Sequence, residues 1–293
     1  MKNSEREAYT RYLTERLDSG QSQNIVISTT TNLIVQKACN LGHVRVLDVG
    51  CFSGAMLNRI RNDVPDTIRE RVEFVGVDVD GEALKLGRKK YQDLLLLSGE
   101  ANSGFENLDS FDIIIMSNII HEAIPEKNET DQETEEAVLL IVNNATRVLN
   151  SEGNLVILDG LRPEDDQELV TVGFSGNELA DLFEFFANKY QAFPIQAARL
   201  PENRFQTRIK DLAAFLTKAR YLGEDYWDIE SRQNYQFFTA RQYVRTLDAC
   251  GMEVERFEPQ IFDQKYLKNI IAKIEPKVAM PVKNVLVVAK KKD

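Results

Sequence analysis

Short apolar runs recur along the chain, and segments with helical spacing of apolar residues lie between most of them. The first run, Val44 to Val49, is interrupted only by Arg45 and Asp48, which is typical of a strand buried on both faces of a parallel sheet. Six further runs predict strands at residues 72–77, 93–97, 112–116, 154–158, 252–257 and 282–289. This alternation predicts an α/β fold.

The intervening segments carry helix signals. Apolar residues between 138 and 149 recur with a period of 3.6, which predicts a helix with one buried face. Thr239 and Gln242 have the spacing of a capping box, and Gly251 is expected to end the helix that follows. Two helices are also predicted ahead of the first strand, over residues 4–17 and 28–39. They would cover either a ligand crevice or only the sheet edge.

Residues 160–238 are predicted to be a helical insertion. They hold 14 of the 25 aromatic residues of the chain. That density suits a lid that excludes water and binds an apolar or aromatic substrate. The insertion's own core or a contact in a homodimer would use the same residues equally well. The candidates for substrate contact are Tyr226, Trp227, Tyr235 and Phe238.

Charge narrows the class of partner. The 293 residues include 46 acids and 36 bases, for a net charge of −10. Such a field repels a phosphate backbone, so nucleic acid is an unlikely substrate and a small molecule is favoured. The basic run at residues 85–90 is expected to be a solvated helix face.

The cysteines, the N-terminal sequence and the length of the apolar runs indicate the cellular compartment. The cysteines Cys39, Cys51 and Cys250 are too few and too scattered for a disulfide framework or a zinc site, so no metal is expected. The polar N-terminus has no signal-peptide pattern, and the apolar runs are too short to span a bilayer. A soluble, cytoplasmic protein is predicted.

The first strand runs into a glycine loop, which contains the residues Asp48, Gly50, Cys51, Phe52 and Gly54. Glycines let the backbone turn sharply and let a ligand approach the main chain. The dinucleotide pattern G-x-G-x-x-G is broken because Phe52 stands at its middle glycine, and no Walker lysine follows. The remaining pattern, D-x-G-x-x-x-G, either binds a different nucleotide-like ligand or is an ordinary strand-to-helix turn.

This pattern resembles the first motif of class I S-adenosylmethionine-dependent methyltransferases, and three later strand ends resemble further motifs of that family. The resemblance covers residues 42–159 and 239–289. It implies a seven-stranded, mostly parallel, doubly wound sheet with an antiparallel last strand, and S-adenosylmethionine as the cofactor. The residues from Val49 to Gly54 would meet the amino acid end of that cofactor.

The other strand ends supply the remaining cofactor candidates. Asp78, with Val79 beside it, ends the second strand, where a carboxylate can accept from both hydroxyls of a ribose. Glu100 and Ala101 occupy the position at which the family binds adenine, although the family's usual residue there is aspartate rather than glutamate. Asp80 is a reserve ribose ligand and a helix cap.

The fourth strand ends in Ser117 and Asn118, which resemble the polar pair that faces the reactive methyl group in the family. His121 follows, and an imidazole titrates near neutral pH, which suits proton abstraction. The catalytic candidate is therefore His121, with helix capping or packing as the alternative. Asp159, at the end of the fifth strand, would contact substrate or only bound a loop.

The predicted activity is methyl transfer to an oxygen, nitrogen or carbon atom of a small, partly apolar metabolite. The alternatives are a non-catalytic protein that binds the cofactor and a partner, and a nucleic-acid methyltransferase. The latter lacks its usual Asn/Asp-Pro-Pro-aromatic motif after the fourth strand. The expected domains are residues 1–41, the sheet domain at 42–159 and 239–293, and the insertion at 160–238.

Overall fold

The computed structural model describes residues 8–13, 23–101, 108–124, 130–278 and 280–292. These residues divide into two compact units. The sheet unit comprises the described residues within Arg6–Asp159, Val244–Glu258 and Leu286–Asp293, and the second unit comprises those within Gly160–Tyr243 and Pro259–Val285. The division gives residues 259–285 to the second unit, whereas the sequence analysis grouped them with the sheet.

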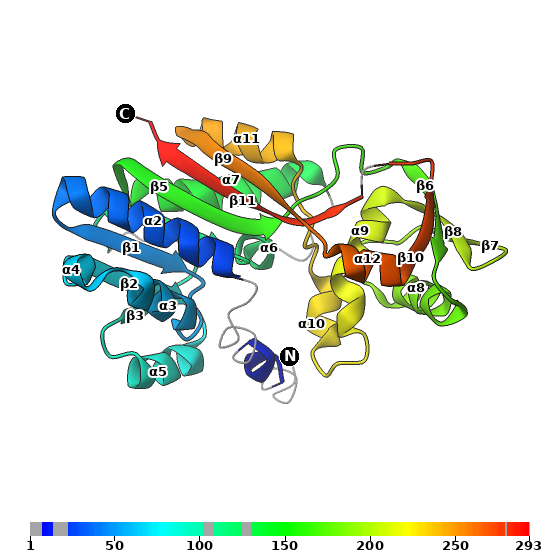
Figure 1. The fold of residues 1–293 in the computed structure, drawn as a ribbon, viewed down its shortest axis with the longest axis horizontal. Coiled ribbons are helices and arrows are strands. Elements are labelled where there is room, and N and C mark those ends of the chain that lie inside the picture. The colour runs from blue at the N-terminus through cyan, green and yellow to red at the C-terminus, as the bar shows by residue number, and fades with distance from the viewer. Residues whose placement is uncertain (1–7, 14–22, 102–107, 125–129, 279, 293) are drawn as a thin grey trace. The chain divides into compact units, whose positions relative to one another are not determined.

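The sheet unit is built on a seven-stranded sheet in the order β3-β2-β1-β4-β5-β11-β9 (Figure 1). Six strands run parallel and the last strand of the chain, β11, is antiparallel, as the family resemblance implied. The strands are β1 (Val44–Val49), β2 (Val72–Asp78), β3 (Leu95–Ser98), β4 (Phe111–Ser117), β5 (Leu149–Gly160), β9 (Met252–Ile261) and β11 (Val282–Lys291).

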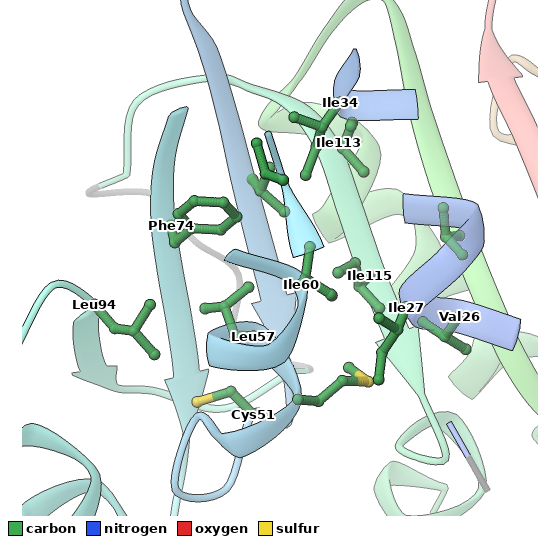
Figure 2. Close-up of a cluster of buried hydrophobic side chains, with 14 of the residues drawn as sticks. Val26, Ile27, Ile34, Cys51, Leu57, Ile60, Phe74, Leu94, Ile113 and Ile115 are labelled. Atoms are coloured by element: carbon green, nitrogen blue, oxygen red, sulfur yellow. The ribbon is translucent and has the colours of Figure 1, made fainter. Parts of the chain in front are cut away.

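Both faces of this sheet are buried. On one face, Ile27 of α2 and Ile60 of α3 pack with Ile113 of β4 in a single apolar cluster (Figure 2). Successive strand residues point to opposite faces, and the alternate residues Ile114 and Met116 are also fully buried. The helices associated with this unit are α2 (Asn24–Leu41), α3 (Ala55–Asp63), α4 (Asp66–Arg69), α5 (Gly81–Lys90), α6 (Ile120–Ala123), α7 (Asp131–Arg147) and, in part, α11 (Ala240–Ala249).

The local signals read from the sequence are largely confirmed here. Thr239 and Gln242 make the predicted reciprocal cap, with Gln242 N donating to Thr239 Oγ1 over 3.3 Å and Thr239 N to Gln242 Oε1 over 2.9 Å. Asp80 caps α5 by accepting from the backbone N–H groups of Glu82 and Ala83. Of the first predicted helix, the described residues 8–13 are helical, and the remainder lies outside the described residues.

The prediction that the insertion is purely helical is wrong. The second unit contains a four-stranded antiparallel sheet in the order β10-β6-β8-β7. In the same unit α12 ends at Ile270, and β10 follows it directly. The elements are β6 (Leu169–Phe174), α8 (Asn177–Lys189), β7 (Ala197–Leu200), β8 (Arg204–Arg208), α9 (Ile209–Lys218), the 3-10 helix η2 (Ala219–Tyr221), α10 (Trp227–Arg232), α12 (Gln264–Ile270) and β10 (Ile271–Glu275).

Aromatic side chains form the core of the second unit. Phe183 of α8 lies edge-on to Phe205 of β8 and to Phe215 of α9, with ring centroids 5.1 Å and 5.0 Å apart. Phe174 of β6 and Phe186 of α8 join the same cluster. Much of the aromatic density noted in the sequence therefore holds this unit together, since such ring pairs add to the stability gained by burial.

The described residues contain neither a membrane-spanning helix nor a metal-binding cluster. No helix among the described residues is long and apolar enough to cross a membrane. In the same part of the chain, no group of histidine, cysteine, aspartate and glutamate side chains could hold a metal ion.

Candidate active site

The glycine loop turns through a series of left-handed backbone positions. Gly50, Phe52 and Gly54 have φ angles of 75°, 51° and 79°. The N–H groups of Gly50 and Cys51 both donate to the carbonyl oxygen of Val77, at 2.8 and 3.1 Å, which holds the loop to the end of β2. A Cβ atom on Gly50 would lie 2.6 Å from the Ile119 side chain, so only glycine fits here.

Asp78 holds this loop from the neighbouring strand. Its Oδ2 accepts the Phe52 N–H at 2.7 Å, and its Oδ1 accepts the Asp80 N–H at 2.8 Å. Burial raises the pKa of Asp78, and those two amides hold that pKa lower than burial alone would. A carboxylate has about four acceptor positions, so Asp78 can accept a ligand hydroxyl in addition to backbone amides. Val79, which follows, is 66% exposed.

Asp48 is the least satisfied acid in this region. It is 1% exposed, and neither carboxylate oxygen accepts a hydrogen bond from the part of the chain that the structure describes. Burial, and secondarily the Asp78 carboxylate, raises the pKa of Asp48 well above its ordinary value. A buried carboxylate without donors is costly when ionised, so a ligand that brings a cation or N–H donors would relieve it.

The end of β3 lies beside Asp78. The Gly99 N–H donates to the Asp78 carbonyl oxygen at 3.0 Å, and β2 and β3 pair in register through Asp78 and Ser98. Glu100 is exposed and Ala101 half-buried, immediately after this contact. The two adenine candidates thus follow the strand that adjoins the ribose candidate.

Ser117 and Asn118 end β4. Ser117 is buried, and Asn118 adopts a positive φ of 56° while its N–H donates to the Leu158 carbonyl oxygen at 2.7 Å. Its side-chain amide lies 3.3 Å from Ser117 Oγ. This polar pair is fixed to β5, because β4 and β5 pair in register at Ser117 and Leu158.

His121 is held by Asp159, a contact that the sequence analysis did not predict. The two residues are 38 positions apart in the chain, yet His121 Nδ1 lies 2.7 Å from Asp159 Oδ1. Asp159 Oδ2 accepts the backbone N–H groups of Ile120 and His121 at 3.0 and 3.3 Å. The available signal was that both residues lie at the carboxyl ends of neighbouring strands, which meet at one edge of a parallel sheet.

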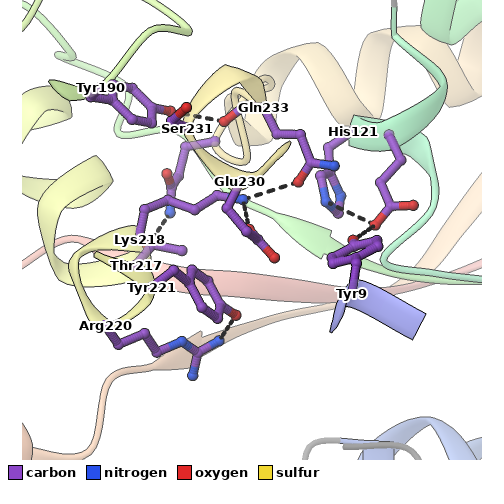
Figure 3. Close-up of polar contacts among 12 residues, drawn as sticks. Tyr9, His121, Tyr190, Thr217, Lys218, Arg220, Tyr221, Glu230, Ser231 and Gln233 are labelled. Atoms are coloured by element: carbon purple, nitrogen blue, oxygen red, sulfur yellow. Dashed lines mark hydrogen bonds and ion pairs between the residues drawn. The ribbon is translucent and has the colours of Figure 1, made fainter. Parts of the chain in front are cut away.

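A second carboxylate lies on the other side of the ring. Glu122 Oε1 is 3.9 Å from His121 Nε2, and the Tyr9 hydroxyl donates to the same Oε1 at 3.0 Å (Figure 3). The His121 side chain is 4% exposed, whereas that of Glu122 is 33% exposed. The imidazole therefore lies between one fully buried carboxylate and one that reaches solvent.

The four predicted substrate residues lie in the second unit and pack with its other side chains. Tyr226 meets Tyr221 edge-on, and Trp227 lies 6.0 Å from Phe186 between ring centroids. The other two are Tyr235, whose ring lies under the Lys218 ammonium, and Phe238, which packs on Phe237 and Tyr243. Only Trp227 is not classed as buried.

An open parallel sheet with an antiparallel last strand, a glycine loop after β1 and an acid ending β2 together define a class I methyltransferase. A sequence model of the methyltransferase domain matches residues 41–189, which is half of the chain. The chain belongs to this methyltransferase family. It is an enzyme, and its cofactor is S-adenosylmethionine.

Several solved methyltransferase structures are similar to this chain. The plantazolicin methyltransferase BamL, in complex with a triazolic desmethylPZN analog and SAH, has a TM-score of 0.51 and 12% identity over 97% of this chain and 91% of its own. CalS10, an SAM-bound amino pentose methyltransferase from Micromonospora echinaspora, has a TM-score of 0.49 and 15% sequence identity, and the match covers 96% of each chain. An SAM-dependent methyltransferase from Methanosarcina mazei has a TM-score of 0.46 and 14% sequence identity, and the match covers 85% of this chain and 93% of its own. A comparison with curated protein sequences finds no match.

Proposed function

We propose that this enzyme transfers the methyl group of S-adenosylmethionine to a small, partly apolar metabolite. The observation that carries the proposal is the carboxyl edge of β1 and β2, where a buried carboxylate without donors, Asp48, lies near the glycine loop and near Asp78. The net charge of −10 supports a small acceptor over a polynucleotide.

The residues present fit this cofactor. S-adenosylmethionine combines a cationic amino acid end with a ribose and an adenine, and it supplies a methyl group that its sulfonium has already activated for displacement. Gly50 to Gly54 with Asp48 would hold the cationic end, since Asp48 lacks a partner of its own among the described residues. Asp78 would accept from the ribose hydroxyls, with Val79 against the same region.

The outer cofactor positions follow from the same edge of the sheet. Glu100 and Ala101 would bind the adenine, because they follow the strand that pairs with β2 at Asp78. Ser117 and Asn118 would line the reactive end, because β4 adjoins β1. The task of the protein is then mainly to hold nucleophile, carbon and sulfur in line.

His121 would act as the general base for an acceptor that carries a proton. Its contact with Asp159 supports that role, because a carboxylate that bonds one ring nitrogen holds the imidazole in a fixed orientation. For the acceptor itself, the candidates are the aromatic residues Tyr226, Trp227, Tyr235 and Phe238 of the second unit, which suit an apolar or aromatic molecule.

Calorimetry tests the cofactor assignment first. The native protein should bind S-adenosylmethionine, and Asp78→Ala should weaken that binding more than tenfold. Glu73→Ala is the matched control, since Glu73 lies at the other end of β2 and pairs with Arg45. Absence of binding by the native protein would refute the assignment.

Turnover tests the remainder of the proposal. The native protein, a metabolite extract and S-adenosylmethionine labelled at the methyl group should give a labelled small molecule. Binding of the cofactor with no transfer to any extract component would instead favour a protein that keeps the cofactor without turnover.

A further inference from the structure

A buried pair of opposite charges lies within the second unit. Lys218 ends α9 and Glu230 lies in α10, and their side chains are 2% and 5% exposed. Lys218 Nζ is 2.5 Å from Glu230 Oε2 and 3.2 Å from Gln233 Oε1 (Figure 3). Removing two charges from water is costly, and an apolar pair of similar size often stabilises a fold as well or better. Stability alone therefore does not account for these residues.

The hydrogen bonds of this pair are incomplete. Glu230 Oε1 accepts from no residue that the structure describes, although its side chain is almost fully buried. An ammonium can only donate, so the Gln233 amide oxygen faces Lys218, and the two N–H groups on Gln233 Nε2 meet no acceptor in the same part of the chain. Gln233 is half-buried, so solvent reaches this group. A strong acceptor and two donors remain open around one ammonium.

Aromatic rings surround that ammonium. The ring centroids of Tyr221 and Tyr235 lie 5.9 and 5.6 Å from Lys218 Nζ, within the range of a cation–π contact. Tyr226 meets Tyr221 edge-on, with ring centroids 6.0 Å apart. Two of the four residues proposed to contact the acceptor, Tyr226 and Tyr235, are therefore grouped with the open polar atoms.

Main-chain contacts hold the end of α10 in place. The Tyr190 hydroxyl donates to the Gln233 carbonyl oxygen at 2.9 Å. The N–H groups of Gln191 and Ala192 both donate to the Ser231 carbonyl oxygen, also at 2.9 Å. These bonds join the end of α10 to the segment that follows α8. Binding groups that are fixed in advance lose less conformational freedom when a ligand arrives.

We propose that Glu230, Gln233 and Lys218 bind the polar edge of the methyl acceptor, and that this edge is the uncharged amide or lactam group of a ring-bearing molecule. The inference rests on the proposed function and narrows its acceptor. The N–H of the amide would donate to Glu230 Oε1, and its carbonyl oxygen would accept from Gln233 Nε2. An amide presents this donor and this acceptor on one planar edge, and the tyrosine rings suit the attached ring.

The balance of charge favours an uncharged group. Lys218 and Glu230 offset each other. Arg220, which bonds the Tyr221 hydroxyl, is exposed, so solvent and salt screen its charge. An anion would gain from Lys218 but lie against Glu230, and a cation would meet the reverse. Either ion would also give up its hydration without a counter-charge of its own, which an amide need not do.

Three small probes test the native site. Benzamide, benzoate and benzylamine share one ring and differ in the charge of its substituent. Ligand-observed NMR titrations at pH 7, without cofactor, measure their affinities. Benzamide should bind roughly tenfold or more tightly than either charged probe. No binding of benzamide, or equal or tighter binding of a charged probe, would overturn the proposal.

Two substitutions of matched shape should change the order of the probes. Glu230→Gln removes the negative charge and leaves Lys218 unbalanced, so benzoate should become the tightest ligand. Gln233→Glu adds a negative charge beside the pair, so benzylamine should become the tightest. A purely structural role would lower stability without changing this order. The native order in either folded variant would therefore contradict the proposal.

The same exchanges at exposed positions of the unit are the controls. Glu184→Gln and Gln206→Glu alter the net charge equally but lie on the surface, and both should keep the native order of the probes. A change of order in the controls would mean that overall charge sets the preference, and it would overturn the assignment. Circular dichroism verifies folding. If Glu230→Gln does not fold, Gln233→Glu decides alone, because Gln233 is only half-buried.

Turnover separates this inference from the proposed function. In the extract assay, the labelled product should contain an amide or lactam, and Gln233→Leu should raise the KM for that acceptor roughly tenfold with kcat and the KM for the cofactor little changed. A product without such a group, or an unchanged KM, would overturn the inference and leave the proposed function intact. If the native protein makes no product, the proposed function fails, whereas the probe titrations still decide what these residues bind.

Discussion

Gly87 of α5 lies directly against the backbone carbonyl of Ser53 in the glycine loop. A Cβ atom on Gly87 would stand 2.2 Å from that oxygen and 2.6 Å from a Leu96 methyl group. To accommodate this Cβ atom, the backbone of the loop or of the helix would have to shift, and such a shift is energetically costly. The position of α5 therefore fixes the shape of the loop that we propose holds the cofactor.

Gly87→Ala should destabilise the protein by about 1–3 kcal/mol, the usual cost of overpacking, and should weaken binding of S-adenosylmethionine more than tenfold. Gly81→Ala is the control from the same helix, because a Cβ atom there meets nothing within 4 Å. It should be neutral or stabilising by up to about 1 kcal/mol. Chemical denaturation and calorimetry measure both effects, and equal behaviour of the two variants would contradict the packing argument.

Asp48→Asn should change how stability depends on pH. Burial raises the pKa of Asp48, so the native state keeps a proton that the unfolded chain releases above its own pKa of about 4. Native stability then falls as the pH rises from about 4 through the raised pKa, by about 1.4 kcal/mol for each pH unit between the two. Asparagine does not titrate, so the stability of the variant relative to the native protein should increase as the pH rises.

Thermal midpoints of the cofactor-free proteins at pH 5 and pH 8 measure this effect. The gain of Asp48→Asn should be larger at pH 8, and its affinity for S-adenosylmethionine should be lower. Asp63→Asn, which changes an exposed carboxyl group at the end of α3, should follow the native curve. If the thermal midpoint of Asp48→Asn depends on pH as that of the native protein does, folding does not change the pKa of Asp48, and the prediction is wrong.

The buried ion pair of the second unit should be sensitive to loss of one partner. Lys218 Nζ lies 2.5 Å from Glu230 Oε2 and 3.2 Å from Gln233 Oε1, with both charged residues at most 4% exposed (Figure 3). Lys218→Met should cost about 3–5 kcal/mol because it leaves a buried carboxylate unpaired. The double variant Lys218→Met/Glu230→Leu should recover most of that loss.

Urea unfolding followed by tryptophan fluorescence suits this comparison, since the single tryptophan, Trp227, begins α10 of the same unit. Arg199→Met is the control, because Arg199 pairs with Asp181 and Glu184 while 40% of its side chain is exposed. That variant should cost less than about 1 kcal/mol. A Lys218→Met cost no greater than the Arg199→Met cost would refute the prediction.

The three cysteines should react in a fixed order. Cys39 is exposed, Cys250 is half-buried with its pKa raised by burial to about 11, and Cys51 is buried with its pKa raised well above its ordinary value, mainly by burial. Since the thiolate is the reactive species, iodoacetamide at pH 8 should label Cys39 first and Cys51 only on unfolding. Peptide mass spectrometry follows each site, and early labelling of Cys51 would contradict the packing of the loop.

Local patterns predicted the sheet unit well. The strands β1, β2 and β4 are apolar on both faces, and each ends in an acid, a glycine or a small polar residue, so their type and their ligand-binding ends could be inferred together. The two capping interactions at Asp80 and Thr239 were also predicted, because a cap depends on residues two or three positions apart.

The second unit was predicted poorly for a physical reason. β6 and β8 are short, and only a few alternating positions in each, such as Val170, Val172 and Phe205, are buried. In β10, Ile271 and Ile274 are three residues apart, a spacing that also fits a helix. What makes these segments strands is their pairing with each other, which no local pattern contains.

The contact between Asp159 and His121 could not be predicted for the same reason. It depends on the register of β4 against β5, with Ser117 opposite Leu158, and on the short turn that brings His121 back over the end of β5. The sequence placed both residues at the correct edge of the sheet. It gave Asp159 only the roles of substrate contact or loop boundary.

The chain crosses between the two units after residues 159, 243, 258 and 285, so neither unit is one uninterrupted stretch of polypeptide. A clone limited to residues 41–189, the span that matches the family, would lack β9 and β11 and would encode only a fragment of the neighbouring unit. Grafting the second unit onto a related scaffold would likewise demand four splice junctions. The acceptor specificity that we propose for the second unit is therefore more practically altered by point substitutions than by exchange of modules.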